Sequence, residues 1–207
     1  MAKKTVNEQK FKPYKPSNYI NEVVGTPSDI IRRAKPQKKA YILNAAFNPF
    51  LVFVIIWILF DSAFFVGMFF VIENMGGGFY YFILLGVAAF MAIHLMPVWM
   101  YIRSLVNASK FVQICEYAYT KDQLFIQVPN KKEVEVYTVN FADVAVIEKR
   151  EGRIDKRCGV GDIRLITNRE FVLIDIEKST EIYNELRELV FSESTLVDKT
   201  KIDAFRL

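Results

Sequence analysis

The sequence predicts an α+β membrane protein, in which a two-helix transmembrane hairpin precedes a small domain of β-strands closed by one helix. Three observations support this prediction. Two long apolar runs, at about 48–72 and 79–102, are separated only by the six residues ENMGGG. From residue 111 onward, six segments show apolar residues with a period of two. An amphipathic helical pattern follows the last of these segments.

Each apolar run is long enough to cross a bilayer, because about 20 apolar residues at 1.5 Å per residue span a 30 Å hydrocarbon core. Backbone polar groups in lipid must be paired internally, so both runs should be helices. The short linker returns the chain to the side it left. We therefore expect a tight antiparallel hairpin and a connecting helix within residues 42–110, with a bend near Pro97.

Charge orients this hairpin. Residues 1–41 carry ten basic and three acidic residues, whereas the tip carries only Glu73. Because Lys and Arg beside membrane helices stay in the cytoplasm, both termini should be cytoplasmic and the protein multi-pass in the cytoplasmic (inner) membrane. The first apolar run begins too far from the N-terminus, and is too long, for a signal peptide. In that compartment Cys115 and Cys158 should be ordinary reduced thiols.

The rest of the chain divides into three further parts. Residues 1–41 form a basic cytoplasmic arm, in which Ser28 and Asp29 could cap a short helical turn through Arg33. Residues 111–192 form the β domain, and residues 193–207 a polar tail. The predicted strands are CEYAYT, QLFIQV, EVEVYTV, ADVAVIEKR, DIRLIT and EFVLIDI. The closing helix begins at Ser179 and Thr180, and its apolar face contains Ile182, Tyr183, Leu186, Leu189 and Val190.

Four stretches in the second half carry a family resemblance: YAYTKDQLFI from Tyr117, FADVAVIE from Phe141, CGVGDIRLIT and VLIDIEKSTEIYNEL. Their order resembles the bacterial PH domain family of small membrane proteins. AKPQKKAYIL before the first apolar run resembles the segment that often reads Arg-Pro-Ser in that family. The resemblance implies a PH-like β-barrel capped by a C-terminal helix. The segment Ile176-Glu177-Lys178-Ser179 lacks the Asn-Pro pair that is frequent before the closing helix in that family. Within the signature, Gly159 and Gly161 would allow a sharp entry into a strand, and Asp162 could accept backbone N–H bonds.

Two polar residues within the apolar runs require an explanation. A carboxylate such as Asp61 near a helix centre costs about 2.5–3.5 kcal/mol and usually faces protein or water. His94, the chain's only histidine, lies in the other run. The expected difference in depth is about 6 Å at 1.5 Å per residue, which a helix tilt could bridge. Three interpretations stay open: helix packing, an ion or proton site, and a partly neutral carboxyl without a special role.

Two basic clusters are candidate contacts for anionic lipid or an acidic partner. The first is the segment KREGRIDKR, which contributes Lys149, Arg150, Arg153, Lys156 and Arg157. The second comprises Arg32, Arg33 and Lys35, which follow Ile30 and Ile31. The alternatives are a solvated loop for the first cluster and an ordinary positive membrane flank for the second.

The sequence does not favour an enzyme. The β domain has no histidine for a catalytic triad, no metal-ligand spacing and no glycine-rich phosphate loop, and acidic residues such as Asp143, Glu148 and Asp162 look scattered. We expect no cofactor, no metal and no nucleic-acid partner. The predicted function is a non-enzymatic, membrane-anchored PH-like scaffold or adaptor that recruits an unidentified protein or senses anionic membrane lipid. We expect a homo-oligomer or a larger membrane complex. The alternative is a small oligomeric transport or channel subunit that uses Asp61 and His94.

Overall fold

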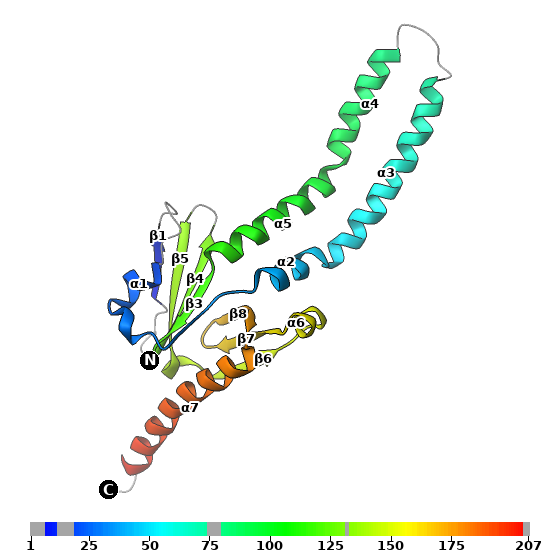
Figure 1. Cartoon of the computed structure of the whole chain (residues 1–207). Coiled ribbons are helices and arrows are strands. Elements are labelled where there is room, and N and C mark those ends of the chain that lie inside the picture. The colour runs from blue at the N-terminus through cyan, green and yellow to red at the C-terminus, as the bar shows by residue number, and fades with distance from the viewer. Residues whose placement is uncertain (1–6, 12–18, 74–79, 131–132, 205–207) are drawn as a thin grey trace. The chain divides into compact units, whose positions relative to one another are not determined.

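The computed structural model describes residues 7–11, 19–73, 80–130 and 133–204, with side chains in 19–71, 81–130 and 133–191. The chain forms a mixed α+β structure of two compact units, Met1–Leu43 with Ser109–Leu207, and Asn44–Ala108 (Figure 1). We call the first the sheet unit and the second the hairpin unit. The sheet unit is thus built from chain on both sides of the hairpin unit, so the N-terminal segment is not the separate arm that the sequence predicted.

Two antiparallel sheets make up most of the sheet unit. The five-stranded sheet has the order β1-β5-β4-β3-β2, in which β1 is Asn7–Phe11 and β2 is Arg32–Ala34. The three-stranded sheet has the order β6-β7-β8. All six predicted strands are present, with bounds Glu116–Tyr119 (β3), Gln123–Asn130 (β4), Glu133–Asn140 (β5), Val146–Arg150 (β6), Val160–Ile166 (β7) and Glu170–Glu177 (β8). The described residues do not form the expected closed barrel. After β5 the chain makes the 3₁₀ turn η2, Phe141–Asp143, and β6 begins a separate sheet.

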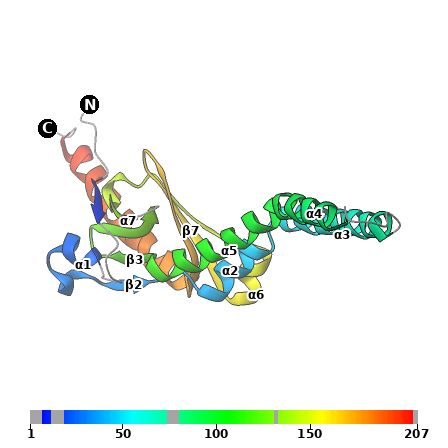
Figure 2. The same cartoon turned by 90° about the horizontal axis from the view of Figure 1, so that it is seen from above.

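The N-terminal segment supplies both edges of the five-stranded sheet. Strand β1 (Asn7–Phe11) pairs with β5, and β2 (Arg32–Ala34) pairs with β3. Helix α1 (Tyr19–Val24) buries Tyr19 and Ile20 against this sheet, beside which it lies in Figure 2. The 3₁₀ turn η1 covers only Pro27–Asp29, so the predicted turn through Arg33 is wrong beyond Asp29. Residues 1–6 and 12–18 of the expected arm lie outside the described residues.

One apolar core joins the two sheets to helix α7, Ser179–Ala204. Alternate residues of β7 point into it, as predicted, and Ile163 and Leu165 are fully buried. The helix contributes Ile182, Leu186 and Val190, which are also buried. Each such aliphatic side chain contributes about 1.5–3 kcal/mol on burial. Helix α7 continues to Ala204, where the sequence had suggested an irregular polar tail from residue 193.

Among the described residues, the hairpin unit contains one helix that is long and apolar enough to cross a membrane by itself. This is α3 (Pro49–Glu73), whose apolar span Pro49–Val71 is largely exposed, unlike the core helix of a soluble protein. Asn48 caps α3, because its Oδ1 accepts a hydrogen bond from the Leu51 N–H at 3.2 Å. Helix α2 (Lys38–Ala46) precedes it.

The second apolar run is broken rather than continuous. Helix α4 (Tyr80–His94) ends at His94, and α5 (Met96–Ile114) follows after a break at Leu95, at an angle of 43°. These two helices meet the length and apolarity expected of a membrane span only when taken together. The expected bend is present, because Pro97 has no N–H to donate to the Ile93 carbonyl and its ring crowds that carbonyl. The predicted tip, including residues 74–79, lies outside the described residues.

Candidate functional site

The two polar residues of the hairpin unit meet. Nδ1 of His94 lies 2.6 Å from Oδ1 of Asp61, so helices α3 and α4 share a hydrogen bond between side chains. His94 is the last residue of α4, immediately before the break at Leu95. The expected difference in depth between the two residues is therefore bridged.

Aromatic rings surround the histidine. The imidazole stacks on Trp57 and on Phe90, each with a centroid distance of 4.8 Å. The Trp57 indole also donates a hydrogen bond of 2.8 Å to the His94 backbone carbonyl, at the point where α4 ends. Both the ring and the backbone of His94 are thereby held in place from α3.

Asp61 is 3% exposed, and only one of its carboxyl oxygens is paired. Oδ1 contacts His94, whereas Oδ2 is buried without a hydrogen-bond partner among the described residues. The His94 side chain is 26% exposed, so the pair is not sealed on all sides. A buried carboxyl beside an imidazole can bind a proton or a small cation, or it can serve only to hold two helices together.

The predicted basic segment is partly helical. Helix α6 (Arg153–Cys158) follows β6; the Gly152 N–H donates to Oδ2 of Asp155 at 2.6 Å at its start, and Gly159 ends it with a φ of +70°. This left-handed φ explains why glycine stands at position 159. Gly161 is needed for another reason, because a Cβ there would lie 2.7 Å from the Ser179 hydroxyl.

The structure divides the five cations of this segment into two groups. Lys149 is paired with Glu151 at 2.6 Å, and Arg150 with Glu148 at 3.1 Å. The other three are exposed on α6 and make no ion pair within the described part of the chain; they are Arg153, Lys156 and Arg157. We call these three residues the α6 cations.

The N-terminal basic cluster is engaged in ion pairs within the sheet unit. Arg32 contacts Glu181 at 3.0 Å and Glu185 at 2.6 Å, which raises the pKa of Arg32. Arg33 and Lys35 both contact Glu116, at 2.8 and 3.2 Å.

These cations nevertheless line one side of an open pocket of about 420 Å³, which we call the β2 pocket. Its other charged lining residues are Lys38, Glu177 and Lys178. The pocket therefore has an excess of positive charge, even though four of its cations, Lys178 included, already have acidic partners.

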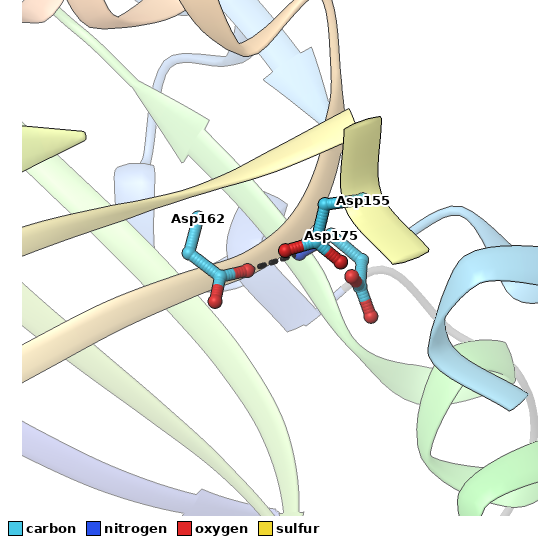
Figure 3. A group of neighbouring side chains, drawn as sticks. All are labelled: Asp155, Asp162 and Asp175. Atoms are coloured by element: carbon cyan, nitrogen blue, oxygen red, sulfur yellow. Dashed lines mark hydrogen bonds between the residues drawn. The ribbon is translucent and has the colours of Figure 1, made fainter. Parts of the chain in front are cut away.

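An acidic cluster is present that the sequence reasoning missed (Figure 3). Asp155, Asp162 and Asp175 place carboxylate oxygens within 4.8 Å of one another. Asp155 caps α6, and Oδ1 of Asp162 accepts the Asp175 N–H at 2.8 Å, as the signature suggested for Asp162. Burial raises the pKa of Asp162. The prediction that Asp162 lies on a scattered, solvated strand face is therefore wrong.

Some of these contacts had a signal in the sequence. Trp57 and Asp61 are four residues apart, as are Phe90 and His94, so each pair falls on one face of its helix. The acidic cluster had no such signal, because only the pairing of β7 with β8 and the fold of α6 bring its members together.

Comparison with protein-family models, with curated protein sequences and with solved structures finds no match to this chain. The resemblance to the bacterial PH domain family therefore rests on the quoted residues and on the order of the elements.

Proposed function

We propose that this protein is a non-enzymatic adaptor, anchored in the cytoplasmic membrane by a two-helix hairpin. Its sheet unit, which we propose is PH-like, lies at the cytoplasmic face and recruits a protein partner or senses anionic lipid. Two sheets sharing a core with a C-terminal helix support the PH-like assignment. The chain works as a homo-oligomer or in a larger membrane complex.

The observation that carries this proposal is strand pairing across the hairpin unit. Strand β2 precedes the apolar helices and β3 follows them, yet the two strands are paired, with Arg32 opposite Tyr119. The same holds for β1 and β5. Strands paired in one sheet must lie on one side of a membrane. A chain that enters the bilayer along α3 must therefore return, which favours α4 and α5 together as the second span.

The α6 cations and the β2 pocket are the surfaces that this proposal assigns to recognition. Lys and Arg near an anionic membrane surface each contribute about 1 kcal/mol to attraction. The α6 cations are exposed and have no competing ion pair in the described part of the chain. The β2 pocket is only 11 residues along the chain from the start of α3, from Lys38 to Pro49.

The native Cys158 on α6 allows this assignment to be tested with the full chain. An environment-sensitive fluorophore on Cys158 is compared in nanodiscs of neutral lipid and in nanodiscs that also contain anionic lipid. We expect a blue shift that appears only with anionic lipid and disappears when the α6 cations are changed to Glu. The matched control is Lys121→Glu, which reverses an exposed charge in the turn between β3 and β4. Equal spectra in both lipids would remove lipid sensing by α6.

A small oligomeric transport or channel subunit is the second candidate, and the Asp61–His94 pair is the observation that favours it. Two helices cannot enclose a pathway, so this function requires several hairpins around an axis. Native mass measurement of the complex, together with water-accessibility labelling of an Asp61→Cys variant, distinguishes the two functions. A single-copy chain or a dry position 61 excludes a pathway.

A further inference from the structure

We propose that Asp61 and His94 form a proton-binding site inside the hairpin unit, whatever partner the sheet unit binds. In the proposed state, the two side chains together carry one proton more than they do in the anionic pair, which consists of a carboxylate beside a neutral imidazole. Binding follows a simple balance: a proton added to the anionic pair gives either a carboxylate with an imidazolium or a carboxyl with a neutral imidazole. Both products are neutral overall.

The charge balance of the hairpin requires this extra proton. Between residues 49 and 72, and between 79 and 102, the sequence has no Lys or Arg, and Asp61 is the only acidic residue. No nearby cation is therefore available to neutralise an Asp61 carboxylate. An unpaired charge in an apolar interior is costly, so such groups take up a proton or pair with an opposite charge. Among the described side chains, His94 is the one that contacts Asp61 and can supply that charge.

The geometry agrees with a proton held between the two side chains. The Nδ1–Oδ1 separation of 2.6 Å is short, as in hydrogen bonds that involve an ionised group. Trp57 and Phe90 present their rings to the imidazole, which stabilises a positive charge on it. The neighbouring ring of Phe60, at 6.5 Å, is also apolar. Among the described side chains, the other titratable groups of α3, α4 and α5 are Tyr81, Tyr101, Arg103 and Lys110, and the Tyr101 hydroxyl donates instead to the Ala46 carbonyl at 2.8 Å.

The environment of the second carboxyl oxygen of Asp61 supports the proposal independently. Oδ2 is buried and has no hydrogen-bond partner among the described residues. In an anionic pair this oxygen would share a full negative charge without solvent, which is the least favourable of the states considered. Addition of a proton to the pair removes that net charge.

Because His94 is the only histidine, isotope labelling of histidine gives a spectrum of this residue alone. The full chain is labelled at histidine and aspartate and placed in nanodiscs at about pH 7.5. This pH is about one unit above the ordinary pKa of a histidine side chain. ¹⁵N chemical shifts report the ring protonation, and ¹³C shifts report the Asp61 carboxyl, which is assigned by its through-space correlation with the labelled His94 ring. We expect an imidazolium, or a neutral imidazole beside a protonated Asp61. A neutral imidazole beside an ionised Asp61 would overturn the proposal.

Variants test whether the proton belongs to the pair. In Asp61→Asn, the His94 ring should be neutral at the same pH, whereas Ser62→Ala, next along α3 with its hydroxyl bonded to the Ile58 carbonyl, should match the wild type. An imidazolium that persists in Asp61→Asn would also contradict the proposal, because the proton would then not depend on Asp61. The wild-type spectrum decides the question even if the variant does not fold.

Discussion

Nη1 of Arg32 lies 2.6 Å from Oε1 of Glu185, and this ion pair joins residues that are 153 positions apart. It links β2, before the hairpin unit, to α7, near the end of the chain. The same Glu185 accepts a hydrogen bond from the hydroxyl of Tyr119 on β3. Two strands and the closing helix therefore meet at one carboxylate, which explains how the two chain segments form one unit.

The first prediction concerns this network. Arg32→Gln should lower the free energy of unfolding of the sheet unit by about 1 kcal/mol or less, because the paired side chains are partly exposed. Arg32 also lowers the pKa of Glu181 below its ordinary value of 4.5. The contribution of this ion pair to the free energy of unfolding is therefore present above pH 4.5, and it is lost as the pH falls through the lowered pKa of Glu181. Urea denaturation in nanodiscs at neutral and acidic pH measures both effects.

Lys121→Gln is the control for this prediction, since Lys121 is exposed and has no ion pair within the described residues. If Arg32→Gln and Lys121→Gln have equal stability at neutral pH, the network contributes nothing.

The second prediction concerns the acidic cluster. Burial raises the pKa of Asp162 above its ordinary value of 3.8, so the folded state favours its protonated form. The stability that the protonated Asp162 carboxyl contributes is present below pH 3.8, and it is lost as the pH rises through the raised pKa of this residue. Asp162→Asn keeps an acceptor for the Asp175 N–H and removes the charge. We therefore expect a melting temperature a few degrees higher at pH 7, and no gain at pH 3.

Asp122→Asn, at an exposed position in a turn, should leave the melting temperature unchanged and serves as the control. A lower melting temperature for Asp162→Asn at pH 7 would mean that the ionised carboxylate is stabilising, and would contradict the prediction.

The third prediction concerns the two thiols. Cys115 is fully buried, and burial raises the pKa of its thiol to about 12. Cys158 is half-buried on α6. Because the thiolate is the reactive form, a maleimide at pH 7.5 should modify one cysteine per folded chain and two after unfolding. Mass spectrometry counts the labels, and Cys158→Ser should give none in the folded state. Rapid labelling of Cys115 would show that the core between the sheets opens readily.

Sequence patterns were sufficient to predict the positions of the six strands in the second half of the chain and the start of α7. In these elements alternate or three-to-four spaced residues, such as Ile163, Leu165 and Leu186, face one core. The strands β1 and β2 could not be predicted in this way. They are five and three residues long, lie among Lys and Pro, and are strands only because partners beyond the hairpin unit pair with them.

The hairpin residues illustrate the same limit. Composition alone identified Asp61 and His94, because polar residues in apolar helices are rare. Their contact depends on where α4 ends, and Pro97 sets that end through its missing N–H. For the basic segment, composition predicted five equivalent cations, whereas the fold of β6 and α6 pairs Lys149 and Arg150 with acidic neighbours and leaves three exposed.

The central claim, that the sheet unit lies on the cytoplasmic side and the hairpin tip outside, is tested most directly by thiol labelling in bacterial cells that express the full chain. A membrane-impermeant maleimide is applied to intact cells and to inverted membrane vesicles. One chain is the wild type, labelled at Cys158, and the other is Gly77→Cys with Cys158→Ser. We expect Cys158 to be labelled only in inverted vesicles and position 77 only in intact cells. Labelling of Cys158 from outside intact cells, or release of the chain from membranes by alkaline carbonate, would contradict the account.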